Sequence, residues 1–121
     1  MFIYRKLDVW HLAKNLAIKT YQITKTFPQE EKFTLTSQIN RSAVSVPSNI
    51  AEGCSRTSFK DQAHFSEIAY GSLMELACQM EIAKDLGYME ESELELILAD
   101  IETLAVKLSN YKRMQVERIL K

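Results

Sequence analysis

Apolar side chains recur every three or four residues in four successive segments of this sequence, and this spacing constrains the fold most. The segments cover about residues 8–26, 33–52 and 59–86, and a fourth runs from about residue 90 almost to the C-terminus. Only three glycines and two prolines occur among 121 residues, which is too few for the turns of many short strands. The sequence therefore predicts four amphipathic helices and an all-α fold.

Local signals mark where these helices end. Phe27 precedes a proline and so disfavours helix, while Ser58 is placed to cap the third helix. Gly53 and Gly87 follow the second and third helices, where a left-handed residue often forms the C-terminal cap. Because the connections are short, consecutive helices should be antiparallel neighbours. We expect an up-down-up-down four-helix bundle in a single domain of residues 1–121.

Pro47 lies inside the second expected helix, where it removes a backbone donor at a cost of about 3 kcal/mol. Asn49, Ile50 and Glu52 keep the helical phase set before the proline, which favours one kinked helix. A break at Val46 is the alternative.

Polar residues form a second stripe at heptad spacing beside the apolar face of this helix. A solvated face is more often built of Lys and Glu, so small hydroxyls and amides favour a hydrogen-bonded helix contact, within or between subunits. A face turned to water is the alternative. Small residues in the third helix would let another helix approach it closely, so they are candidates for the same contact. The candidate contact residues are Gln38, Ser42, Ser45, Asn49, Glu52, Gly71, Ser72 and Glu75.

Three runs, YRKLDVWHLA (residues 4–13), LTSQINRSAVSVPSNIAEGCSR (35–56) and IAYGSLMELACQMEIAKDLGY (68–88), carry a family resemblance. In this order they resemble the four-helix bundle proteins encoded in intervening sequences of bacterial 23S rRNA genes. The resemblance implies a left-handed bundle that assembles as a homopentameric ring and has no catalytic activity. The chain is similar also to accessory proteins of diversity-generating retroelements, which bind nucleic acid and a reverse transcriptase.

Members of the family often carry two basic residues and two alanines after the glutamine of the second run. This chain has Asn40, Arg41, Ser42 and Ala43 there, so one positive charge is missing.

The formal net charge is only −1, but the up-down topology would separate the charges. One end would hold eight basic and four acidic residues, and the other three basic and eight acidic residues. A basic end could engage phosphates, although solvation and helix dipoles also separate charge. The candidate nucleic-acid contacts are Arg5, Lys6, Arg41, Arg56, Lys60, Arg113, Arg118 and Lys121.

The sequence contains no constellation typical of an enzyme, a cofactor site or a metal site. The pairs Asp8/His11 and Asp61/His64 have the spacing of metal ligands in bundle cores, but both lie in first turns and His11 should point outward. The two cysteines lack CxxC spacing, which favours free thiols. Neither a signal peptide nor a membrane span is indicated, so we expect a cytoplasmic protein.

Two hypotheses follow for function. The first is a non-enzymatic homo-oligomeric scaffold or adaptor, pentameric by resemblance, that binds RNA or DNA through its basic end. The second is a protein–protein interaction module that docks a protein partner and has no nucleic-acid role.

Overall fold

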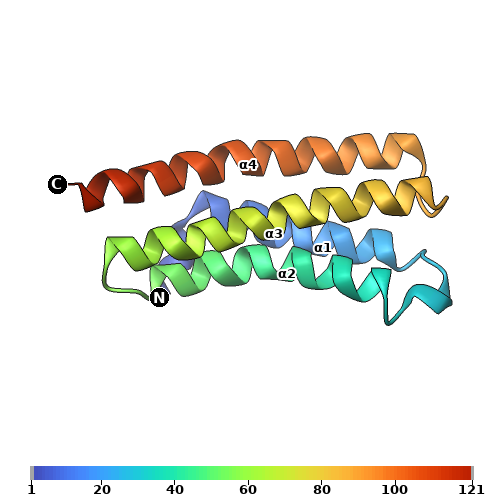
Figure 1. Ribbon diagram of the computed structural model, residues 1–121, viewed down its shortest axis with the longest axis horizontal. Coiled ribbons are helices and arrows are strands. Elements are labelled where there is room, and N and C mark those ends of the chain that lie inside the picture. Colours follow the sequence, from blue (N-terminus) through green and yellow to red (C-terminus); the bar gives the residue numbers. More distant parts are fainter. Residues whose placement is uncertain (1, 121) are drawn as a thin grey trace.

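The computed structural model describes residues 2–120 and contains four long antiparallel helices (Figure 1). The starts of α1 and α3 lie at the same end of the molecule as the ends of α2 and α4. No strand occurs among the described residues, so the predicted all-α up-down bundle is confirmed. The elements are η1 (Ile3–Lys6), α1 (Asp8–Thr24), η2 (Gln29–Glu31), α2 (Leu35–Cys54), α3 (Phe59–Asp85) and α4 (Glu91–Ile119).

Three of the four predicted helix-end signals are confirmed and one is wrong. α1 ends at Thr24, before Phe27 and its following proline. Ser58 Oγ accepts a hydrogen bond from the backbone N–H of Asp61 at 3.1 Å, and Gly87 adopts a φ of 87° after α3. Gly53 lies inside α2 and is not left-handed. A Cβ there would lie 3.0 Å from the Cβ of Phe65 in α3. Close approach of the two helices, and not a C-terminal cap, therefore explains this glycine.

The second helix continues through its proline. α2 is one helix from Leu35 to Cys54, with no break at Val46. Val46 and Ile50, on either side of Pro47, are 0% and 1% exposed. Because both side chains are anchored in the core, packing offsets the lost backbone hydrogen bond and keeps the helix in phase.

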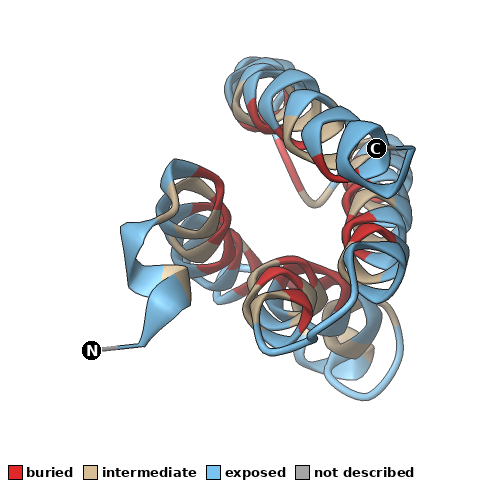
Figure 2. Ribbon diagram, turned by 90° about the vertical axis from the view of Figure 1, so that its left-hand side faces the viewer, coloured by how far each residue is buried: buried red, intermediate tan, exposed pale blue. Residues whose placement is uncertain are grey.

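The apolar faces of all four helices meet in one core (Figure 2). Leu16, Ile39, Leu73 and Leu104 represent the four helices in this cluster. Each helix packs on the next along the chain, so α2 and α4 lie on opposite sides of the bundle (Figure 2). The pair α1 and α4 is the least tightly packed of the four neighbouring pairs.

A polar link joins each neighbouring pair of helices. Between α1 and α2, Thr24 Oγ1 donates to Asn40 Oδ1 at 2.9 Å. Between α3 and α4, Ser66 Oγ donates to Gln115 Oε1 at 2.6 Å, with both residues buried. The link between α2 and α3 belongs to the polar stripe and is described below.

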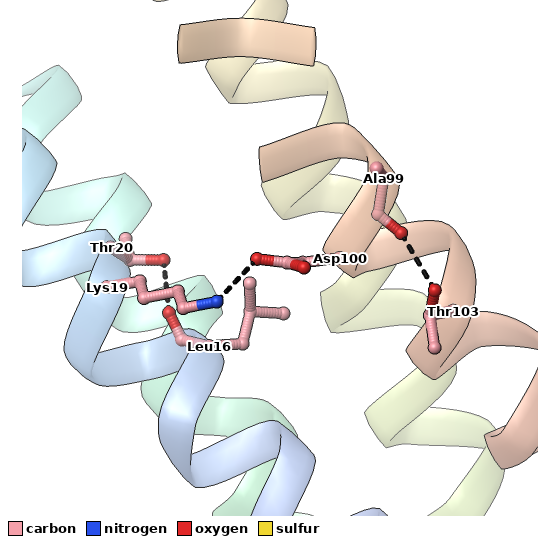
Figure 3. A network of polar contacts seen from close by, with 6 residues as sticks. All are labelled: Leu16, Lys19, Thr20, Ala99, Asp100 and Thr103. Atoms are coloured by element: carbon pink, nitrogen blue, oxygen red, sulfur yellow. Dashed lines mark hydrogen bonds and ion pairs between the residues drawn. The ribbon is translucent and has the colours of Figure 1, made fainter. Parts of the chain in front are cut away.

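The α1–α4 seam is bridged at the surface by an ion pair, Lys19 Nζ to Asp100 Oδ2 at 2.8 Å (Figure 3). Surface hollows of about 390 and 510 Å³ share these two residues in their walls. The hydroxyls of Thr20 and Thr103 instead donate to carbonyls of their own helices, at 2.8 and 3.1 Å (Figure 3). Among the described residues, therefore, the ion pair is the side-chain hydrogen bond that links α1 to α4, whereas both threonine bonds stay within one helix.

Candidate functional site

The end of the bundle formed by η1, the starts of α1 and α3, and the ends of α2 and α4 carries the predicted basic residues (Figure 1). Arg41 is not among them, because it lies on the outer surface of α2, within two turns of that helix's start. Lys121 lies outside the described residues. The exposed basic residues that share this end are Arg5, Lys6, Arg56, Lys60, Arg113 and Arg118.

Aromatic rings lie beside several of these cations. The guanidinium carbon of Arg56 is 4.7 Å from the ring centre of Phe65, and that of Arg118 is 5.3 Å from Phe59. Arg5 lies 5.6 Å from the ring of Phe2. Such distances are typical of cation–π pairs. The basic end therefore presents flat apolar surfaces together with positive charge.

A fourth pair lies on α1, where Lys14 Nζ is 5.2 Å from the ring of Trp10. Trp10 also packs against Tyr4, with ring centres 4.6 Å apart. This small aromatic group joins η1 to α1 next to the basic end.

Most of the positive charge at this end is not neutralised within the chain. Arg56 pairs with Glu52 at 2.9 Å, an exposed contact one helical turn apart. Within residues 2–120, no ion pair involves Arg5, Lys60, Arg113 or Arg118. Their charges are therefore free to attract phosphate groups.

The acidic end is tied together by local hydrogen bonds. Thr34 and then Tyr88, whose hydroxyl donates at 2.8 Å, lower the pKa of Glu31, and the same bond raises the pKa of Tyr88. Lys84 lies 3.0 Å from Glu91, and this hydrogen bond raises the lysine's pKa. Charge is thus partly compensated here, whereas it is mostly uncompensated at the basic end.

The middle of the polar stripe lies at the contact between α2 and α3 of the same chain. Ser45 Oγ is 2.7 Å from Ser72 Oγ, and Asn49 Nδ2 donates to the carbonyl and hydroxyl oxygens of Ser45 at 2.8 and 2.9 Å. Ser42 is buried, whereas Gln38, at the start of the stripe, is exposed. A contact between subunits through this stripe stays a prediction.

The remaining candidate contact residues face outward. Glu52 is exposed and pairs with Arg56, and Glu75 is exposed on α3. Gly71 is also exposed, and a Cβ built there would meet no atom within 4 Å. Gly71 therefore does not serve a close helix contact inside the chain.

A shallow hollow of about 970 Å³ lies over the N-terminal half of α2 and reaches α1 and α3. Sequence periodicity did not identify it, because its walls come from three separate stretches of the chain. Phe33, at its edge, is 86% exposed, and the ammonium of Lys32 lies 5.4 Å from its ring. We call this surface the α2 hollow; its walls include Tyr21, Lys25, Lys32, Phe33, Arg41, Val44, Ser45, Ser72 and Glu75.

No group of three metal-binding side chains is found among residues 2–120. His11 is exposed, and its Nε2 lies 2.7 Å from the carbonyl oxygen of Arg5. Cys54 and Cys78 are both free thiols. Burial, followed by the contact with Cys54 at 3.8 Å, raises the pKa of Tyr111. None of the described helices is long and apolar enough to cross a membrane.

Comparison with known proteins identifies the family. The model of the 23S rRNA-intervening sequence protein family matches residues 5–110. A crystal structure of a protein of unknown function from the S23 ribosomal protein family of Bacteroides thetaiotaomicron superposes with a TM-score of 0.80. That similarity covers 86% of this chain and 97% of the other at 24% sequence identity, and it shows the fold alone. The search of curated proteins finds no significant match. Because the family model spans most of the bundle, the chain belongs to the 23S rRNA-intervening sequence protein family.

Proposed function

We propose that this protein is a non-enzymatic, homo-oligomeric adaptor of the cytoplasm that binds nucleic acid through its basic end. The observation that carries the proposal is the set of cation–aromatic pairs there, formed by Arg56 with Phe65, Arg118 with Phe59, and Arg5 with Phe2. Cations attract phosphates, and aromatic faces stack on unpaired bases.

The exposure of the rings decides which nucleic acid fits best. Phe2 is 64% exposed and Phe59 is 40% exposed, so part of each ring is open to a base. Bases inside a duplex are already stacked and do not offer their faces. We therefore expect single-stranded RNA or DNA to bind more tightly than duplex DNA of the same length.

Assembly into a ring would strengthen such binding. Copies that point the same way add the positive electrostatic fields of their basic ends, although each copy carries the same residues. One strand can then bind to several copies at once. The proposed number of five copies rests on the sequence resemblance described above. The exposed ends of the polar stripe, Gln38 and Glu52, leave surface for a contact between subunits.

The first experiment measures size and affinity together. Light scattering on the purified protein should give several times the mass of one chain at micromolar concentration. Fluorescence anisotropy measures the binding of a short single-stranded RNA between low and physiological salt. The logarithm of the binding constant should fall linearly with the logarithm of the salt concentration. A monomer would contradict the assembly, and equal affinity for single strand and duplex would contradict stacking on the aromatic rings.

Two charge reversals on one helix provide a matched comparison. Arg118→Glu changes the basic end, whereas Lys107→Glu changes an exposed lysine farther up α4 by the same charge, and light scattering first shows that both variants keep the wild-type mass. Arg118→Glu should weaken RNA binding, and it should lower the slope of log affinity against log salt by about one per lost phosphate contact. Lys107→Glu should change the affinity and the slope less. Equal effects would show that net charge alone acts. Binding of a protein and no nucleic acid would instead support the interaction-module hypothesis, which the α2 hollow favours.

A further inference from the structure

The outer face of α4 has the spacing of a helix that packs on another helix. Residues recur there at intervals of four, three, four, three and four, which is a heptad pattern. Leu96 is 72% exposed and Val106 is 62% exposed, although neither carries a polar group. We call this surface the α4 outer face; its residues, all uncharged and exposed, are Ser92, Leu96, Ala99, Thr103, Val106 and Asn110.

Acidic side chains border the α4 outer face on one side, whereas Asp100 and Lys107, two turns apart, lie on the other. Glu95 and Glu102 are two turns apart, both exposed, and neither forms an ion pair within the described residues. Asp100, on the side facing α1, is already paired with Lys19. The surface therefore combines an uncharged centre with an unneutralised negative edge.

The α2 hollow has the opposite character. Its walls contain three cations, Lys25, Lys32 and Arg41, and one carboxylate, Glu75. None of the three cations forms an ion pair in the described part of the chain. Between them lie exposed apolar groups, and Val44 is 41% exposed. In charge and polarity the hollow complements the α4 outer face.

The two surfaces lie at the same height along the bundle but on opposite sides of it. α2 and α4 both start at the end drawn on the right in Figure 1 and run in the same direction. At a rise of about 1.5 Å per residue, Arg41 lies about 9 Å from the start of α2, and Leu96 to Glu102 lie about 8–17 Å from the start of α4. The helices face away from each other (Figure 2). One copy cannot bring its own two surfaces together.

We propose that the α4 outer face of one copy docks on the α2 hollow of a second copy of this chain, with the two bundles side by side and pointing the same way. This inference rests on the proposed homo-oligomer and names its contact surfaces. Because the contact joins two different faces, each copy keeps one face free for a further copy. Such a head-to-tail contact closes into a ring where the rotation between neighbouring copies permits and otherwise continues as an open filament, whereas a contact of one face with itself stops at a dimer.

Two charge-reversed variants test the pairing. The hollow variant carries Lys25→Glu, Lys32→Glu and Arg41→Glu, and the helix variant carries Glu95→Lys and Glu102→Lys. All five side chains are exposed, so each variant should fold, which a circular dichroism melt checks. Light scattering at micromolar concentration should show each variant alone shifted to the mass of one chain. An equimolar mixture should form larger species than either variant alone, because each contact between unlike copies then pairs opposite charges; a closed ring of five would keep one like-charged contact, so the mixture need not reach the wild-type mass.

A second comparison tests the apolar centre of the contact. Leu96→Glu should dissociate the assembly, while Leu120→Glu, which changes an 81% exposed leucine at the other end of α4, should leave its mass unchanged. If the wild-type chain is an oligomer and neither charge variant changes its mass, this docking is wrong and the proposed assembly stands. If only the helix variant dissociates, α4 pairs with itself and the docking on α2 is again wrong. A monomeric wild-type chain would overturn both proposals.

Discussion

The buried hydrogen bond between Ser66 and Gln115 offers the sharpest test of how α3 and α4 are held together. Ser66 is 2% exposed and Gln115 is 1% exposed, and the hydroxyl donates to Oε1 at 2.6 Å. Ser66→Ala removes the donor with little change in volume and leaves a buried amide oxygen without this partner. An unpaired buried polar group costs about 1–3 kcal/mol, so we expect the free energy of unfolding to fall by that amount.

The loss should be recovered when both partners become apolar. Ser66→Ala combined with Gln115→Met removes both partners of this bond, and the Tyr111 hydroxyl, which loses its hydrogen bond with Gln115, keeps its contact with Cys54, so stability should return to within about 1 kcal/mol of the wild type. Gln115→Met alone should also destabilise, since it leaves the Ser66 hydroxyl buried and unpaired. The difference between the double variant and the sum of the single variants measures the coupling.

Urea denaturation at one protein concentration measures these changes. With a slope of about 1–3 kcal/mol per molar urea, a loss of about 2 kcal/mol moves the midpoint by roughly 1 M. Ser48→Ala, at an exposed serine of α2, is the control and should move it much less. If Ser66→Ala behaves like Ser48→Ala, or if the two single losses simply add, the bond does not stabilise the core as argued.

Two further predictions concern a pair of glycines and a carboxylate. Gly71→Ala should raise the free energy of unfolding by up to about 1 kcal/mol, because the new Cβ meets no atom within 4 Å, whereas Gly53→Ala should lower it, because its Cβ would lie 3.0 Å from that of Phe65. Thermal melts compare the two, and stabilisation by Gly53→Ala would contradict the close approach. Tyr88→Phe should raise the lowered pKa of Glu31 only partly towards its ordinary value, since the hydrogen bond from Thr34 is the larger cause and remains. The stability that this carboxylate contributes is present above its unfolded pKa and is lost as pH falls through the lowered folded pKa. A carbon-detected NMR titration of Glu31 follows the change, and an unaltered midpoint would show that Tyr88 has no influence.

Helical periodicity predicted the fold because it depends only on neighbours along the chain. Val46, Ile50 and the residues in phase with them mark one face on both sides of Pro47, which favoured a continuous helix over a break at Val46. Ser58 was also recognisable, since its cap bond reaches only to Asp61. Features of this kind need no knowledge of how the helices pack.

Features that depend on packing could not be predicted in this way. Gly53 resembles a helix cap locally, but Phe65 on the next helix is what requires a glycine there. Arg118 and Phe59 lie far apart in the sequence, and only the antiparallel fold brings them together. Heptad spacing predicted that Ser45 forms hydrogen bonds at a contact between helices. It could not show that the partner is Ser72 of the same chain.

The weakly packed seam between α1 and α4 determines which part of the bundle is least secured. α1 has 17 residues and α4 has 29, so much of α4 extends beyond the reach of α1. One exposed ion pair, Lys19 with Asp100, ties them, and exposed pairs contribute at most about 1 kcal/mol. Local opening of a protein follows its weakest boundary. Opening at this seam would separate α1 from α4 while each stays packed on its other neighbour, α2 or α3, and it would uncover the core residues Leu16 and Ile97 to water.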